Sequence, residues 1–176
     1  MFIATNNPQR SSKYPSINPV LAEDTTLLRF DLKQKPSVSI IPSTYYTHRV
    51  TTAFARPTQR MRLISKVFPW TIDIESQSPI TCGDIWEAMH FALQEPIVES
   101  EWGFIARDGK LREAVEAATK KRLAADPTAD KRARRIDFLG DTTLFRGLEK
   151  DDDFAKQVLV PGGKGCSETW VIKLIA

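Results

Sequence analysis

Hydrophobic and polar residues alternate most regularly in two short stretches, residues 60–66 and 70–75. In the second stretch Ile72 and Ile74 fall on one face of an extended chain, while acidic and hydroxylated residues fall on the other. Pro69 separates the two stretches, and because proline has no backbone N–H it suits a bend or a sheet edge. The pattern therefore predicts a kinked pair of strands.

A helical period follows from residue 81. The Thr81 side chain can accept from the N–H groups of the first turn, and Asp84 three residues later approximates a capping box. Pro96 ends the helix, because the residue before a proline is pushed out of the helical region. One apolar stripe follows the helical spacing: Ile85, Trp86, Met89, Ala92 and Leu93. We expect this stripe to pack on the two strands and to form the centre of the core.

Weaker patterns predict the remaining elements. Apolar residues between turn signals indicate strands within residues 27–32, 38–41, 136–139, 158–160 and 170–175. Tyr45 and Tyr46 are expected in an extended segment. A short turn or helix is expected at 99–105, and a second main helix begins after its cap Asp108 and ends before Pro127.

These elements include few β-α-β repeats, which indicates the α+β class. We expect an antiparallel sheet of short strands packed against two main helices. Residues 1–26 show no apolar period and predict an irregular N-terminal arm, either flexible or held by a partner. Residues 27–176 are expected to form a single domain.

Composition and charge agree with an ordinary globular protein. The chain has 176 residues, of which 41% are hydrophobic and 27% charged, with a formal net charge of +3. No apolar run approaches the ~18 residues that cross a bilayer, and the first residues do not form a secretory signal. Two widely separated cysteines fit a reducing compartment. We expect a cytoplasmic or nuclear protein with no membrane partner.

Three stretches taken together resemble a family of small domains found mostly in mushroom-type (basidiomycete) fungi, whose function is unassigned. They are residues 57–75, 80–97 and 134–149, and their motifs include Arg-Ile-Asp at 135–137 and Phe-x-Gly-Leu at 145–148. The resemblance covers most of the chain after the first 26 residues. It implies a fungal, intracellular setting, and it supplies no activity and no catalytic residue.

The cysteines and histidines do not predict a reactive site. Cys82 lies in the first turn of the helix, where free N–H groups can lower a thiol pKa. Asp84 in the same turn opposes that effect, and Cys82 falls on the apolar stripe, so a buried structural cysteine is the better interpretation. The two cysteines, Cys82 and Cys166, and the two histidines, His48 and His90, are not spaced as metal ligands usually are. We expect neither a metal site nor a cofactor.

Acidic residues are the more plausible carriers of chemistry. Asp31, Asp73, Asp137 and Asp141 lie in or beside predicted strands, and a sheet can bring two carboxylates within general acid–base distance. Each of them can equally be a solvent-facing strand residue or a turn cap. Asp137 and Asp141 are the catalytic candidates for an alternative function, a small carboxylate-dependent hydrolase or transferase.

One stretch carries a strong local charge. Seven cations lie within residues 120–135 against two carboxylates: Lys120, Lys121, Arg122, Lys131, Arg132, Arg134 and Arg135. The simplest interpretation is a solvated helix end and loop, but the stretch also fits an acidic partner or a short nuclear import signal. Nucleic-acid binding is a further alternative, although no aromatic residue lies between 105 and 137 to stack on a base.

The leading prediction is a non-enzymatic protein-interaction domain. No catalytic constellation is recognisable, and Tyr45, Tyr46, Trp102 and Phe104 are aromatic residues in segments predicted to be irregular, a type enriched at interfaces. The expected partner is another protein or a second copy of this chain.

Overall fold

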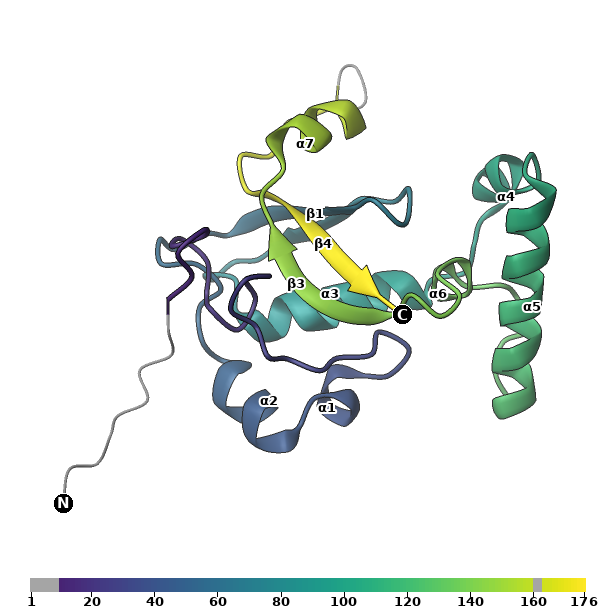
Figure 1. Ribbon diagram of the computed structural model, residues 1–176, viewed down its shortest axis with the longest axis horizontal. Coiled ribbons are helices and arrows are strands. Elements are labelled where there is room, and N and C mark those ends of the chain that lie inside the picture. The colour runs from purple at the N-terminus through teal and green to yellow at the C-terminus, as the bar shows by residue number, and fades with distance from the viewer. Residues whose placement is uncertain (1–9, 160–162) are drawn as a thin grey trace.

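A four-stranded mixed sheet forms the centre of the fold (Figure 1). In the computed structural model, which describes residues 10–159 and 163–176, the strand order is β2-β1-β4-β3. β1 (Arg60–Ser65) pairs antiparallel with β2 (Ile72–Glu75), and β3 (Leu144–Glu149) pairs antiparallel with β4 (Thr169–Ile175). The two pairs are joined by parallel pairing of β1 with β4.

The α+β class is confirmed, but the prediction of a purely antiparallel sheet is wrong. Hairpins leave neighbouring strands antiparallel, whereas a long crossover allows parallel pairing. The chain passes from β1 to β4 through a series of helices and two other strands, so the register of β1 with β4 is set by distant residues.

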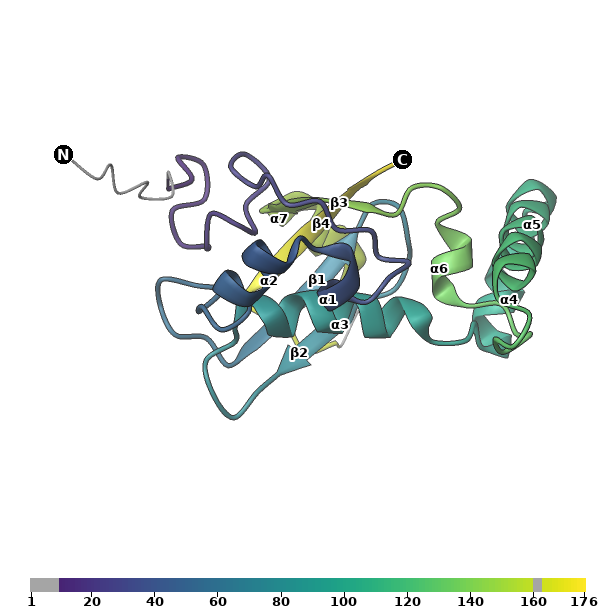
Figure 2. The ribbon, with the colours of Figure 1, turned by 90° about the horizontal axis from the view of Figure 1, so that it is seen from below.

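Helix α3 (Cys82–Gln94) covers one face of the sheet (Figure 2). The Asp84 N–H donates to the Thr81 hydroxyl at 3.2 Å, and Asp84 Oδ2 accepts from the Thr81 N–H at 2.8 Å, which completes the predicted capping box. The buried side chains of the helix are Cys82, Ile85, Trp86, Met89 and Leu93. Burying each large apolar side chain contributes about 1.5–3 kcal/mol, so the predicted central role of this helix is confirmed.

Residues 10–26, expected to belong to an arm outside the domain, pack on the same core. Ile17, Leu21 and Ala22 are buried in it. The Leu148 N–H donates to the Leu21 carbonyl at 2.7 Å, and the Glu23 N–H donates to the Leu148 carbonyl at 3.0 Å. The domain therefore holds this segment itself, along the outer edge of β3. Residues 1–9 lie outside the described part of the chain.

Prolines start two short helices where the sequence predicted extended chain. α1 (Pro36–Ser39) includes the first half of the strand predicted at 38–41, and α2 (Pro42–His48) contains Tyr45 and Tyr46. The fixed φ of proline suits a first helical turn. Both predictions are wrong because helices this short show no helical period of apolar residues.

Acidic residues likewise start two later helices that overlap predicted strands. α6 (Arg135–Phe138) replaces the strand predicted at 136–139, and Asp137 Oδ2 accepts from the backbone N–H of Arg134 at its start. α7 (Asp152–Val158) ends where a strand was predicted at 158–160, of which Val160 lies outside the described residues. The prediction of a strand at 27–32 is also wrong. This segment forms one isolated bridge, from Asp31 to Leu144, and no strand.

α4 (Glu99–Ile105), α5 (Gly109–Ala125) and α6 lie at one end of the molecule, beside the C-terminal end of α3 (Figures 1 and 2). They enclose a small apolar cluster of their own: buried Ile97, Ile105 and Val115, with Trp102, Leu111, Ala133 and Phe138 packed around them. Asp108 Oδ1 accepts from the N–H groups of Lys110 and Leu111, as predicted for the cap of α5. Val115 is the only buried residue of α5, so most of this helix faces solvent.

Candidate functional site

A groove of about 540 Å³ lies between α5 and a wall that includes α6. Four alanines of α5 line one side at helical spacing: Ala114, Ala117, Ala118 and Ala125. Ile136 and Gly140 lie opposite them, and Lys33, Gln94 and Lys121 add polar groups. We call this feature the α5 groove. Its volume falls within the range of ligand pockets.

An ion pair between two residues that line the α5 groove holds α5 against α6. Arg122 Nη2 lies 2.9 Å from Asp137 Oδ2, and the two side chains are only 18% and 4% exposed. Asp137 Oδ2 also accepts from the Thr119 hydroxyl at 3.1 Å and from the Arg134 N–H at 2.9 Å. Because these donors occupy the Asp137 carboxylate, we assign it to holding the two helices together.

Asp141 lies at the exposed rim of the groove. Its Oδ1 is 3.7 Å from Lys33 Nζ and 3.5 Å from Lys121 Nζ, and its side chain is 77% exposed. Exposed ion pairs of this kind contribute only about 0–1 kcal/mol. The structure thus brings Asp137 and Asp141 to one groove, but each carboxylate has cationic partners of its own.

Two arginines of the basic stretch are held by internal bonds. Arg135 Nη2 lies 2.6 Å from Glu101 Oε1, and its guanidinium carbon lies 5.2 Å from the centre of the Trp70 ring. Arg134 Nη1 donates to Gln94 Oε1 at 3.1 Å. These contacts join α6 to α4, to α3 and to the loop before β2.

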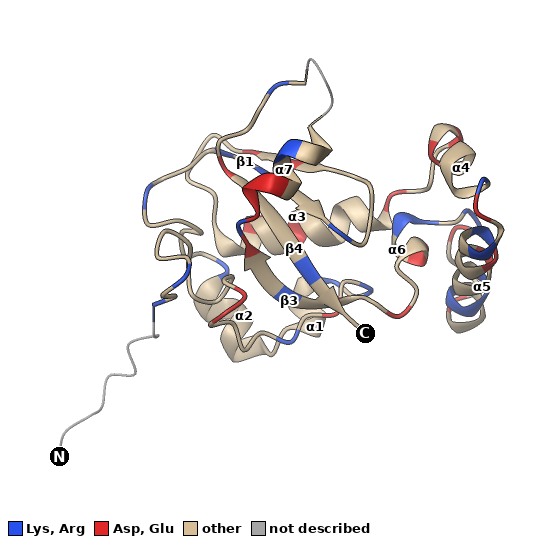
Figure 3. Cartoon of the chain, turned by 45° about the horizontal axis from the view of Figure 1, so that its top comes forward, with Lys and Arg blue, Asp and Glu red and all other residues tan. Residues whose placement is uncertain are grey.

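Apart from Arg122, the other cations of the stretch face solvent along and beyond α5, where Figure 3 shows Lys and Arg residues. Arg132 pairs with Asp130 at 2.6 Å and lowers the pKa of that carboxyl to about 2 through their hydrogen bonds. Lys120 and Lys131 are exposed, and among the described residues no carboxylate oxygen lies within 4.0 Å of either. The free positive charge therefore concentrates near the C-terminal end of α5.

The predicted interface aromatics do not form one surface. Tyr45 is buried in the core, with its ring centre 6.2 Å from that of Trp86. Tyr46 is exposed and packs edge-on against Tyr45. Trp102 is partly buried in the small cluster under α4 and α5, whereas Phe104 on the same short helix is exposed.

Cys82 and His90 both serve the core. Cys82 is buried, and that burial raises the pKa of its thiol to about 11. His90 Nδ1 lies 3.1 Å from the Leu32 carbonyl oxygen, and this contact links α3 to the segment that contains Leu32. Across residues 10–159 and 163–176, no three His, Cys, Asp or Glu side chains are grouped so that they could hold a metal ion.

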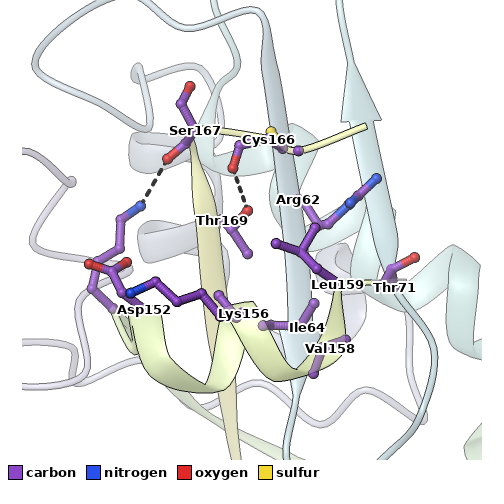
Figure 4. A pocket seen from close by; sticks show the side chains of 13 residues that line it. Arg62, Ile64, Thr71, Asp152, Lys156, Val158, Leu159, Cys166, Ser167 and Thr169 are labelled. Atoms are coloured by element: carbon purple, nitrogen blue, oxygen red, sulfur yellow. Dashed lines mark hydrogen bonds between the residues drawn. The ribbon is translucent and has the colours of Figure 1, made fainter. Parts of the chain in front are cut away.

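A second cavity, of about 400 Å³, lies between α7 and the sheet (Figure 4). Arg62 enters it from β1, but its Nε and Nη2 donate to Asp73 at 2.6 and 2.9 Å. The Thr169 hydroxyl donates to the Cys166 carbonyl at 2.7 Å. Because these polar groups bind one another, we assign them to the stability of the sheet.

Several groove residues were not identified from the sequence. Lys33 lies in a loop far from α5 in the chain, and no local pattern links the two. Ala117 and Ala125 share a helical spacing with Ala114 and Ala118, and that spacing was a usable signal for the face of α5 that lines the groove.

Comparison with known proteins gives one match. The model of a family described as a family of unknown function (DUF6699) matches residues 28–154, which is well over half of the chain. No curated protein and no solved structure matches the chain. Among the described residues no helix is both long and apolar enough to cross a membrane.

Proposed function

Because this chain belongs to the DUF6699 family, whose function is unknown, we propose a function from the geometry of the α5 groove. The protein is a non-enzymatic interaction domain that binds an acidic, amphipathic helical segment of another protein. The proposal retains the intracellular location, cytoplasmic or nuclear, and the fungal origin that the resemblance implies.

The observation that carries the proposal is the alanine-lined face of α5 over an open groove. A helix normally buries an apolar stripe, yet α5 buries only Val115. Its alanines leave room for a second helix to approach closely, because the distance between packed helices depends on the side chains at the contact. A helix that docks in such a groove presents apolar residues at i, i+3, i+4 and i+7.

Charge indicates which helix fits. Lys121 and Lys33 lie at the rim, and Lys120 and Lys131 add positive charge near the end of α5. The contacts of both rim lysines with Asp141 are exposed and weak, so a carboxylate of a partner can replace them at little cost. Complementary charge of this kind raises association rates and selects partners.

The alternatives receive less support from the same residues. Asp137 is fully engaged by donors, and Asp141 is exposed, which does not favour a carboxylate-dependent enzyme. For nucleic acid, internal bonds occupy Arg122, Arg134 and Arg135, which leaves few cations for phosphates.

A displayed library of helical peptides tests the proposal. Selection against the full chain is expected to enrich acidic peptides with an apolar stripe, and Ala117→Glu in the groove is expected to weaken their binding at least tenfold. Ala106→Glu, an equal charge change at an exposed alanine outside both α5 and the groove, is expected to bind within twofold of the unaltered chain. Equal binding by both variants, or enrichment of basic peptides, contradicts the proposal. Self-association is checked by light scattering across a range of protein concentrations.

A further inference from the structure

A separate pocket of about 630 Å³ lies between the N-terminal segment and helices α1 and α2. Polar and apolar residues line it together, and the apolar ones are Pro19, Val20, Leu27, Leu28, Ile40 and Ile41. Leu27 is 94% exposed and Ile41 is 61% exposed, so the pocket offers apolar surface that no part of the described chain covers. The size of the pocket and its combination of apolar surface with a few charged groups suit a small-molecule site.

Hydrogen bonds preform one wall of this pocket. The Thr25 hydroxyl donates to the Pro19 carbonyl at 2.7 Å, and the Thr26 hydroxyl donates to the Val20 carbonyl at 2.6 Å. Asn18 Oδ1 accepts from the Val20 N–H at 3.1 Å. The wall is therefore a closed loop whose shape does not depend on a ligand, which lowers the entropic cost of binding.

Arginines outnumber carboxylates among the residues that line the pocket. Arg10 and Arg29 both line it, and within the described residues neither has a carboxylate oxygen within 4.0 Å. The remaining residues, 1–9 and 160–162, contain no Asp or Glu. Asp24 is the one carboxylate among the lining residues that the structure describes, and it accepts from the Ser11 hydroxyl at 2.6 Å. His48 also lines the pocket.

We propose that this pocket binds a small amphipathic anion, a molecule with an apolar body and a carboxylate or related acidic head. The body covers Val20, Leu27 and Ile41, and the head lies between the two arginines. Guanidinium groups suit this role because their planar donors match a carboxylate in two parallel hydrogen bonds. The site shares no residue with the α5 groove, and most of its N-terminal wall precedes the residues that match the family.

Isothermal titration calorimetry with laurate, below its micelle concentration, tests this proposal on the full chain. One laurate per chain is expected to bind, and Arg29→Gln is expected to weaken binding roughly tenfold through the loss of a charged hydrogen bond. Arg56→Gln, at an exposed arginine outside the pocket, is the matched control and is expected to bind as the unaltered chain does. Circular dichroism checks that each variant is folded.

Two further ligands separate the possible outcomes. Dodecanol has the same apolar body without the charge and is expected to bind at least tenfold more weakly than laurate. Equal binding of the two, or an unchanged affinity in both Arg29→Gln and Arg10→Gln, overturns the proposal. Binding to phosphatidylglycerol vesicles without binding of free laurate also overturns it, since the pocket is then part of a membrane-contacting surface.

Discussion

Replacing Asp137 with alanine gives a quantitative test of how α5 is held. The change leaves the Arg122 guanidinium facing the helix interface without its partner, and it removes the acceptor of the Arg134 N–H and the Thr119 hydroxyl. Breaking a buried pair in this way costs about 3–5 kcal/mol. We expect about 3 kcal/mol, the lower end of that range, because Arg122 is 18% exposed and also donates to the Arg132 carbonyl.

The loss is expected to appear first as local opening of α5. The cluster beneath α4 and α5 buries only Ile97, Ile105 and Val115, so little else holds this end of the molecule. Hydrogen exchange measured by mass spectrometry is expected to show faster exchange in residues 109–125, with α3 unchanged. Urea unfolding gives the change in the free energy of unfolding.

The double variant Arg122→Met with Asp137→Ala provides the control. It removes the unpaired charge, so its loss of stability is expected to be smaller than the sum of the two single losses. An Asp137→Ala variant that loses less than about 1 kcal/mol, the size of an exposed ion pair, and keeps normal exchange in α5 refutes this account of the pair.

Three other predictions concern the core and its edges. Trp86→Ala is expected to lower the free energy of unfolding by about 3–5 kcal/mol in urea titrations, and a loss below 1 kcal/mol contradicts its place in the core. Gly147→Ala is expected to cost more than about 1 kcal/mol in thermal unfolding, because φ is 108° and an added Cβ would clash with the backbone of Glu23. Iodoacetamide at pH 8 is expected to alkylate Cys166 and leave Cys82 unmodified, as mass spectrometry can show, because burial raises the Cys82 pKa to about 11.

Local signals in the sequence predicted the central unit well. Thr81 and Asp84 define the start of α3 by their mutual hydrogen bonds, and the stripe around Trp86 indicates its buried face. These signals lie within one or two helical turns, so neighbouring residues alone decide them. Asp108 predicted the start of α5 for the same reason.

Long-range pairing was beyond such signals. β1 and β4 are far apart in the chain, and their parallel register depends on the complete core. The short helices α1, α2 and α6 follow from Pro36, Pro42 and Asp137, whose helix-starting role is visible only once the neighbouring apolar residues are known not to form strands.

The candidate site was predicted in part. The sequence identified the basic stretch and the two carboxylates, but it could not assign Arg122 to Asp137 or Lys121 to Asp141. Those pairs depend on the angle at which α5 leaves the core. The exposed groove face of α5, which includes Ala114 and Ala117, was not identified from the sequence.

Amide hydrogen exchange of the full chain, with and without an acidic peptide selected in the display experiment, tests the central claim most directly. A helix seated in the α5 groove is expected to slow exchange across residues 109–125 and in α6, and to leave α1 and α2 unchanged. Binding of the peptide with no added protection in α5, or with protection only elsewhere, contradicts the claim.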